Sequence, residues 1–321
     1  MSRFSKLVSG IIAAGLFAVM ATSAFAQLGE LKLIAPAAPG GGWDQTARSM
    51  QSALVASGAA KSVQVTNIPG AGGTVGLAQF VNSRDPNTLM VNGFVMVGAI
   101  LLNKSPVSLD QVTPIARLTE ETLVVVVPAD SPIKTTKDLT AAIKSDVSKV
   151  TFAGGSAGSV DHILAAQIVK AAGADPAKVN YIPFSGGGES IAAILGGKVT
   201  AGISGYAEYE GQIKAGKMRA LGISSDKKMP NIAVPTLKEQ GLDAVITNWR
   251  SVVAAPGISA DDKKKLADAI DKMVKSDAWK EVLKQKGWDD AYMSGDDFAK
   301  FLKAEQARVS EVMKAIGLVK S

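Results

Sequence analysis

The chain has 321 residues, 47% of them hydrophobic and 5% aromatic, with no cysteine and a formal net charge of +6 at pH 7. This length provides one large domain or two of ordinary size. The absence of cysteine excludes disulfides, thiolate catalysis and cysteine-ligated metal sites. The charge suits a small anionic ligand and is far below that of a nucleic-acid-binding surface, so we expect no nucleic acid partner. The low aromatic content favours packed α/β layers.

Residues 1–26 differ from the rest of the chain. Arg3 and Lys6 precede the apolar run LVSGIIAAGLFAVMATSAFA, which ends in a small-x-small triplet. These features are typical of a secretory signal peptide. We predict cleavage before Gln27 and export of the remaining chain, with a net charge of +4 once Arg3 and Lys6 are removed. The alternative is an uncleaved membrane anchor, because the apolar run approaches spanning length.

Short apolar runs alternate with helical patterns in the first half of the exported chain. Pro128 is expected to end the apolar run of residues 123–127. The predicted elements are a strand at 31–36, a helix at 43–57, a strand at 62–69, a helix opening in GAGGTVGLAQFV, a strand at 88–93, a short helix through VMVGAILLN, and one or two strands within 113–130.

The alternation continues after Pro128. Helices are predicted in TTKDLTAAIKS, SVDHILAAQIVKAAG, GGESIAAILGG and AEYEGQIKAG, and strands in KVTFAGG, VNYIPF, VTAGISG and MRALGISS. From about Trp249 the pattern changes to a strand in RSVVAAPG followed by helices at 259–274, 276–286 and 294–315. Strands that alternate with helices indicate mostly parallel sheets with right-handed crossovers.

We therefore predict an α/β protein of two lobes, each an α/β sandwich around a mostly parallel sheet. Residues 27–127 and 247–321 are expected to form lobe I, and residues 128–246 lobe II. The C-terminal helices would cover lobe I, so the chain would cross between the lobes twice, near residues 128 and 247. Two crossings can act as a hinge, and hinged lobes enclose a cleft.

Three predicted strand-to-helix turns are rich in glycine: PGGGWD at 39–44, GGSAGSVD at 154–161 and SGGGE at 185–189. Each leaves backbone N–H groups of a helix start uncovered, where the helix dipole adds positive potential. An anion is stabilised there without lysine or arginine, and in α/β sheets such turns lie where ligands bind. One such turn is more often purely structural, but three in two lobes indicate a ligand with two or three carboxylates. For Asp44 we favour a structural capping role, and Glu189 has the same ambiguity.

The segment GGSAG at 154–158 fits the nucleophile elbow of serine hydrolases. A triad needs a histidine base, and the only histidine is His162, on the helix directly after the turn. It is poorly placed as the base for Ser156, which disfavours hydrolysis. His162 is instead expected either to contact a ligand or to have a structural role.

Two further features have weak or open interpretations. GAGGTVG at 70–76 approaches a dinucleotide fingerprint, but Val75 stands in place of the third glycine, so a plain tight turn is favoured. Arg250, close to the proposed hinge, could clamp a carboxylate in bidentate fashion or form an ordinary inter-lobe salt bridge.

Taken together, these segments resemble the periplasmic substrate-binding receptors of tripartite tricarboxylate transporters. The resemblance rests on APAAPGGGWDQTAR, NIPGAGGTVGLAQF, GGSAGSVDHILA, IPFSGGGESIAAILGGKVTAGISGYAEYEGQIKAGKMRALGISS and NWRSVVAAPGIS, which follow one another over the exported chain. It implies a two-lobed periplasmic binding protein type II fold that closes on an organic carboxylate, held largely by backbone N–H groups. It also implies a partner, the integral membrane permease subunits of such a transporter.

Carried over residue by residue, the resemblance implies three sets of ligand contacts. One carboxylate would be held at 39–42, another at 156–162, and lobe II would close over the ligand at 185–187 and 204–206, with Thr74 and residues 91–93 as further lining. With Arg250 added, the candidate ligand-binding residues are Pro39, Gly40, Gly41, Gly42, Thr74, Ser156, Gly158, Ser159, His162, Ser185, Gly186, Gly187, Ser204, Gly205, Tyr206 and Arg250.

The leading hypothesis is a monomeric, non-enzymatic receptor without cofactor or metal. It would bind a di- or tricarboxylate, with citrate the favoured ligand, and deliver it to a permease. The second hypothesis is an exported serine hydrolase that uses Ser156. The third is a sensor receptor that presents its closed form to a signalling protein, which the sequence does not separate from transport.

Overall fold

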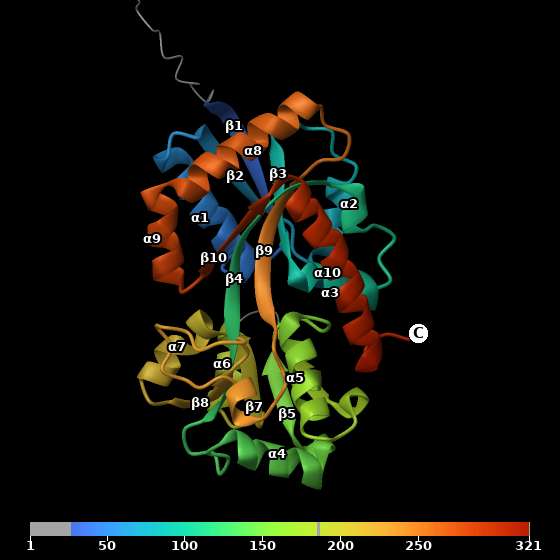
Figure 1. Ribbon diagram of the computed structural model, residues 1–321, viewed down its shortest axis with the longest axis vertical. Helices are drawn as coiled ribbons and strands as arrows, with labels where there is room; N and C mark the ends of the chain where they lie inside the picture. The colour runs from blue at the N-terminus through green and yellow to red at the C-terminus, as the bar shows by residue number, and fades with distance from the viewer. Residues whose placement is uncertain (1–26, 185–186, 321) are drawn as a thin grey trace, which may run out of the picture.

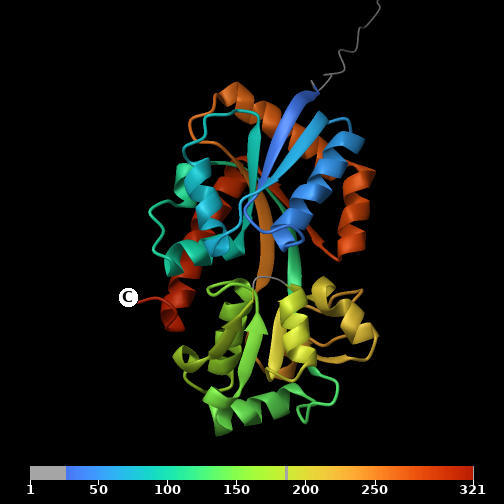
Figure 2. The same cartoon turned by 180° about the vertical axis from the view of Figure 1, so that it is seen from behind.

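The computed structural model describes residues 27–184 and 187–320 and shows two α/β lobes stacked along the long axis of the molecule (Figures 1 and 2). The two-lobed α/β class expected from the sequence is confirmed. The expected signal peptide lies outside the described residues, as do Ser185 and Gly186. Within the described ranges, every helix is too short or too polar to cross a membrane.

Lobe I, the upper lobe in Figure 1, is built on a sheet with the strand order β2-β1-β3-β9-β4-β10. Its strands are β1 (Leu28–Ala35), β2 (Ala60–Asn67), β3 (Thr88–Gly93), the first part of β4 (Thr113–Pro128), β9 (Thr247–Ala254) and β10 (Asp289–Ser294). Its helices are α1 (Gly42–Ala56), α2 (Thr74–Phe80), α3 (Phe94–Leu102), α8 (Ala260–Lys275), α9 (Asp277–Lys286) and α10 (Gly295–Ala315).

Helix α1 shows why this lobe holds together. Trp43, Ala47, Met50 and Leu54 recur at helical spacing and are all buried, so they form one apolar stripe toward the sheet. The opposite face is polar and exposed at Arg48. Helix α1 packs against α8 and α9, although these helices lie about 200 residues further along the chain. The C-terminal segment therefore completes the lobe that the N-terminal segment begins.

Lobe II has the strand order β8-β4-β7-β5-β6. Its strands are the end of β4, β5 (Thr151–Gly154), β6 (Asn180–Pro183), β7 (Ala201–Gly205) and β8 (Met218–Ile223), and its helices are α4 (Thr136–Ser145), α5 (Val160–Ala171), α6 (Gly187–Leu195) and α7 (Tyr206–Lys214). Residues 123–127 of β4 are all 0% exposed. A strand covered on both faces needs an unbroken apolar run, which is what the sequence has there.

The long strand β4 passes through both lobes. Thr122 still pairs with Thr247 of β9 in lobe I, whereas Leu123 pairs with Gly205 of β7 in lobe II. The pairing thus changes a few residues ahead of the boundary expected at 127/128. The chain returns along β9, so two adjacent strands connect the lobes (Figure 1).

Two features differ from the sequence-based expectation. Strands β7, β8, β9 and β10 all run antiparallel to β4, while the parallel pairs are β1 with β2 and β3, and β5 with β6 and β7. Strands β4 and β9 are antiparallel because the chain crosses to lobe II along β4 and returns to lobe I along β9. Strand β10 was expected as part of a helical region; its segment DDAYMS has no apolar alternation, and it is defined by edge pairing with β4.

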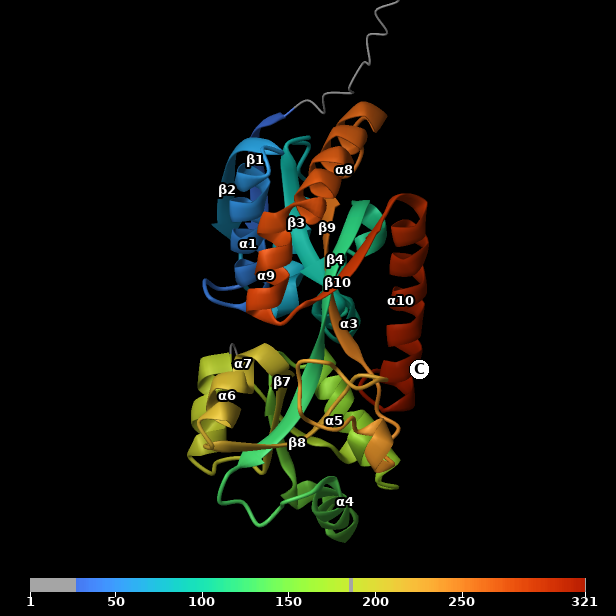
Figure 3. The same cartoon turned by 60° about the vertical axis from the view of Figure 1, so that its left-hand side comes forward.

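The end of α10 forms another contact between the lobes. Figure 3 shows α10 running along the side of the molecule toward lobe II. Just beyond α10, Gly317 packs so closely on lobe II that a Cβ there would come within 2.6 Å of the Cβ of Ala177. The segment after α10 therefore connects lobe I with lobe II by packing, in addition to the two crossing strands.

Candidate ligand-binding cleft

A cleft of about 660 Å³ lies between the lobes, beside the two crossing strands. It is bounded by the turns that follow β1, β5, β6 and β7, at the carboxyl ends of these strands, where α/β sheets bind ligands. The lining comprises Pro36, Ala37, Ala38, Gly40, Gly41, Gly42, Trp43, Gln45, residues 69–73 and Val95 of lobe I, Glu121, Asn248 and Arg250 of the crossing strands, and Gly155, Ser156, Ser159, Val160, Asp161, Phe184, Gly187, Gly188, Ser190, Ile191, Ser204, Gly205 and Glu208 of lobe II.

The candidate residues from the sequence divide into three groups. Those in the lining are Gly40, Gly41, Gly42, Ser156, Ser159, Gly187, Ser204, Gly205 and Arg250. The structure places five outside the lining: Pro39, Thr74, Gly158, His162 and Tyr206. Ser185 and Gly186 lie outside the described residues. The cleft therefore brings together parts of all three glycine turns.

The turn before α1 has fewer available N–H groups than its glycines suggest. Pro39 has no N–H, the N–H of Gly40 donates to Asp44 Oδ2 at 2.8 Å, and that of Gly41 donates to the Ala38 carbonyl at 3.0 Å. The helix starts at Gly42 without a side-chain cap. Gly42 and Trp43 line the cleft and lie in the first turn of this 15-residue helix, where backbone N–H groups have no partner within the helix.

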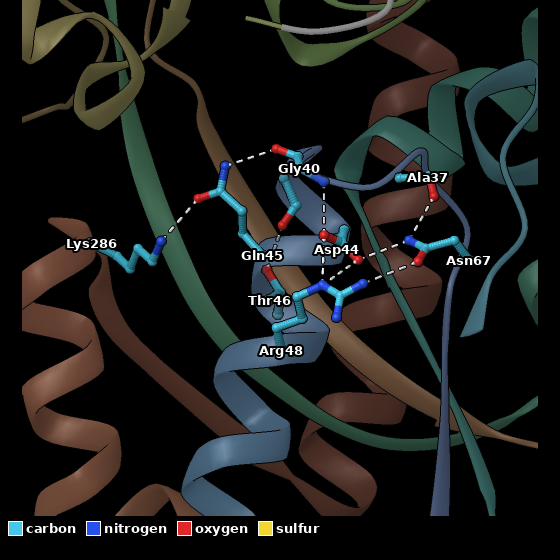
Figure 4. A network of polar contacts seen from close by, with 9 residues as sticks. Ala37, Gly40, Asp44, Gln45, Thr46, Arg48, Asn67 and Lys286 are labelled. Carbon is cyan, nitrogen blue, oxygen red and sulfur yellow. Dashed lines mark hydrogen bonds and ion pairs between the residues drawn. The ribbon is translucent and has the colours of Figure 1, made fainter. Parts of the chain in front are cut away.

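Asp44 stabilises this turn from behind (Figure 4). Its carboxylate is 2% exposed and accepts hydrogen bonds from Gly40, from the guanidinium of Arg48 at 3.0 Å and from Asn67 at 2.8 Å. Burial alone would raise the pKa of Asp44, but the hydrogen bonds from Arg48, Gly40 and Asn67 outweigh it and hold the pKa below its ordinary value. Asp44 thus has the structural role favoured from the sequence. It accepts the N–H of Gly40, which precedes the helix, instead of capping an N–H of the helix itself.

We expect Asp44→Ala to destabilise the protein by about 2–4 kcal/mol, because Gly40, Asn67 and Arg48 all lose a charged acceptor. The free energy of unfolding from urea titration measures this. Asp130→Ala, at an exposed loop position, is the matched control and should change stability by less than about 0.5 kcal/mol. Equal effects of the two substitutions would contradict the structural role of Asp44.

The turn before α5 uses its donors in a similar way. The N–H of Gly155 donates to Asp161 Oδ2 at 2.7 Å, and the N–H of Gly158, at φ +77°, donates to His162 Nδ1 at 3.1 Å. Ser159 caps the helix by accepting the N–H of His162. Ser156 and Val160 line the cleft, and their amides are not among the donors of the hydrogen bonds in this turn.

His162 supports this turn and lies outside the cleft lining. Its ring stacks on Tyr181 with 4.2 Å between the centroids, and its Nδ1 accepts from a backbone amide. Burial lowers the pKa of His162 to about 4, so the ring is neutral at physiological pH. Because Nδ1 already accepts the Gly158 N–H, His162 is bound into the turn rather than directed at Ser156.

We expect His162→Ala to weaken ligand binding by about 2–10-fold, since it removes one hydrogen bond that shapes the α5 turn but no direct contact. Calorimetric titration of the folded variant measures the change. Complete loss of binding would mean that the ring itself contacts the ligand.

Arg250 and Glu121 form a buried ion pair between the crossing strands. Arg250 Nη2 lies 2.5 Å from Glu121 Oε1, its Nη1 donates to Thr46 at 3.2 Å, and its guanidinium stacks over Trp288. Asn248 also donates to Glu121, at 2.9 Å. The sequence left two roles for Arg250, a clamp on a ligand carboxylate or a salt bridge. In this structure its guanidinium pairs with Glu121, and Arg250 also lines the cleft.

Three acidic residues of the lining, Glu121, Asp161 and Glu208, were not expected as site residues. Glycines make room for them. A Cβ at Gly155 would lie 2.9 Å from Asp161 Oδ2, one at Gly187 would lie 2.6 Å from Glu208 Oε2, and one at Gly205 would lie 2.6 Å from Glu121 Oε2. The sequence did contain a sign of two of them, because Asp161 and Glu208 each lie in the first turn of a helix that follows a glycine-containing turn.

The two lobes, the two crossing strands and the cleft between them define a two-lobed solute-binding protein. The chain belongs to the family of tripartite tricarboxylate transporter receptors, whose family model matches residues 46–318. The resemblance found in the sequence is thereby confirmed. Members of this family are substrate-binding receptors rather than enzymes, and receptors of this type are periplasmic. The hydrolase hypothesis is therefore set aside.

Individual relatives agree with this assignment. A protein of Cupriavidus necator, the UPF0065 protein in the gbd 5' region, is 31% identical over 81% of this chain and 79% of its own length. MatC from Rhodopseudomonas palustris, solved with bound malate, is 22% identical with a TM-score of 0.78 and covers 88% of this chain and 98% of its own. Rpa4515 of R. palustris, solved with adipate, is 20% identical with a TM-score of 0.81 over 90% and 97% of the two chains. The two structures show the shared fold.

Proposed function

We propose that this protein is an extracytoplasmic receptor that closes on a small di- or tricarboxylate and delivers it to the permease subunits of a tripartite transporter. The observation that carries the proposal is that the first turns of α1 and α5 line one cleft from opposite lobes. The backbone N–H groups of a first helical turn have no partner within the helix. Such helix starts hold carboxylates without a counter-ion. Within the proposal, the signal peptide is cleaved before Gln27 and the receptor acts as a monomer.

The proposed contacts follow from the lining. In lobe I, the amides of Gly42 and Trp43 hold one carboxylate; in lobe II, Ser156, Ser159 and Val160 hold another, with Ser204 and Gly187 beside them. Pro39, Thr74, Gly158, His162 and Tyr206 would act by shaping the turns. Micromolar affinity requires about −8 kcal/mol. A few charge-assisted hydrogen bonds of roughly 1.5–3 kcal/mol each can supply this after the cost of ordering and closure.

The ligand class follows from size and family. Malate and adipate occupy proteins of this fold, and a cleft of about 660 Å³ accommodates acids of that size together with water. We propose citrate or a related tricarboxylate as the ligand, because the turns of both lobes offer separate sites for carboxylates.

Thermal unfolding of the exported protein with a panel of acids tests the proposal. The panel comprises citrate, isocitrate, tricarballylate, succinate, malate, adipate, glutamate, aspartate and terephthalate. A ligand at about 100 times its dissociation constant stabilises by roughly 2.7 kcal/mol. Stabilisation by tricarboxylates alone supports the citrate assignment, stabilisation by other acids replaces it, and no stabilisation by any acid contradicts the carboxylate receptor.

A further inference from the structure

The cleft that is proposed to bind an anion contains three carboxyl groups, each anchored through one oxygen. Asp161 Oδ2 accepts the Gly155 N–H, Glu208 Oε2 accepts the Ser204 hydroxyl at 2.8 Å, and Glu121 Oε1 accepts from Arg250 and Asn248. Asp161 and Glu121 are only 8% and 4% exposed. Within residues 27–184 and 187–320, the second oxygen of each group has no hydrogen-bond donor, and all three residues line the cleft.

The charges around these groups do not balance. Arg250 is the one cationic side chain among the described lining residues, and it is paired with Glu121. Asp161 on α5 faces Glu208 of α7, Glu121 of β4, and the hydroxyls of Tyr181 and Tyr209; Glu208 faces Glu121 and, at longer range, Arg250. The neighbouring His162 is neutral at physiological pH. Asp161 and Glu208 therefore have no cation of their own.

Burial and the like charges of Glu208 and Glu121 raise the pKa of Asp161 to about 8, against the Gly155 hydrogen bond, which lowers it. Burial and the charge of Glu121 also raise the pKa of Glu208. Both directions agree with the geometry, in which each carboxyl has one oxygen free to carry a proton. In the described part of the chain, no group of three or more acidic or histidine side chains is placed to hold a metal ion that would neutralise these carboxylates.

We infer that Asp161 and Glu208 bind a ligand carboxylate as neutral acids, so that ligand binding at alkaline pH is coupled to proton uptake. The inference rests on the proposed function. A carboxylate beside two ionised carboxyls would be repelled, whereas a neutral acid donates an O–H···O⁻ hydrogen bond, among the strongest in proteins. The proton comes from solvent and stays on Asp161 or Glu208 in the complex.

Calorimetric titration of the exported protein with tricarballylate, succinate and aspartate between pH 6 and pH 9 tests this inference. Two buffers of different ionisation enthalpy at each pH give the number of protons bound. Uptake should be small at pH 6 and approach one proton per ligand by pH 9. The affinity for tricarballylate and succinate, which have no amino group, should fall by up to tenfold per pH unit above about pH 8.

Asp161→Asn is the decisive variant. Its amide oxygen can accept the Gly155 N–H and its NH₂ group can donate to the ligand without a titrating proton. We expect binding at pH 7 within a few-fold of the parent, stronger binding than the parent at pH 9, and reduced proton uptake. Glu208→Gln provides the same test should Asp161→Asn fail to fold. Glu210→Gln, on the same helix but paired with Lys214 outside the cleft, is the matched control and should leave the pH profile unchanged.

The outcomes separate this inference from the proposed function. Binding of tricarballylate or succinate without proton uptake, or with a pH profile unaltered in Asp161→Asn and Glu208→Gln, overturns the inference and leaves the receptor function intact. Tighter binding of aspartate than of succinate, lost at least tenfold in Asp161→Asn, would also overturn it, because the carboxyls would then be ionised partners of an ammonium group. Binding of none of the three acids would count against the inference. No stabilisation by any acid of the larger panel as well would also count against the proposed function.

Discussion

Arg250→Met is expected to destabilise the protein by about 3–5 kcal/mol, the cost typical of removing one partner from a buried ion pair. The side chains of Arg250 and Glu121 are each 5% exposed, and Arg250 Nη2 lies 2.5 Å from Glu121 Oε1, on the two strands that connect the lobes. Methionine replaces much of the volume but leaves the Glu121 carboxylate without its cation, in the neighbourhood of Asp161 and Glu208. Urea unfolding at pH 7 measures the loss.

Two matched variants separate charge from packing. Arg250→Met combined with Glu121→Gln removes both charges and should recover most of the lost stability, because no uncompensated charge stays buried. Lys214→Met removes the partner of Glu210 in an exposed pair and should cost less than about 1 kcal/mol. A double variant no more stable than Arg250→Met alone would show that the guanidinium acts mainly through its stacking on Trp288.

The fold followed from local pattern to a large extent. Helices α1, α8, α9 and α10 begin and end within one or two residues of the ranges expected from apolar spacing and caps. What local pattern could not supply was long-range pairing. Strand β10 is defined by its pairing with β4, which is distant in the sequence. The contact of Gly317 with Ala177 likewise depends on how the end of α10 packs on lobe II.

The sequence predicted the glycine turns that line the cleft but not the carboxyl groups beside them. The glycine turns indicated uncovered amides at helix starts, and parts of all three turns line the cleft. Which amides are available depends on partners distant in the chain or hidden by the turn, such as Asp44 for Gly40 and Asp161 for Gly155. The glycines at 155, 187 and 205 also provide space for carboxyl groups, a role that only three-dimensional neighbours reveal.

Gly98→Ala should weaken ligand binding at least tenfold while leaving the protein folded. Gly98 lies in α3 of lobe I, and a Cβ there would come within 2.1 Å of the carbonyl oxygen of Gly158 in lobe II. The facing atom is a backbone oxygen and the added Cβ is held rigidly by its own backbone, so no side chain can rotate to relieve the contact. The lobes are connected by the two crossing strands, and such a pair of strands can act as a hinge. We therefore expect the overlap to be relieved most easily by holding the lobes apart.

The same substitution at Gly211 is the matched control, because this helical glycine of α7 has nothing within 4 Å of a Cβ and should gain a few tenths to 1 kcal/mol of stability without loss of affinity. Calorimetric titration gives the affinity, and small-angle scattering with saturating ligand shows whether Gly98→Ala stays more extended than the parent. Unchanged affinity with reduced stability would mean that lobe I deforms at α3 before the hinge opens, and that the contact between Gly98 and Gly158 does not limit closure. Lower affinity with unchanged stability would instead identify this backbone contact as the point at which the closed lobes meet.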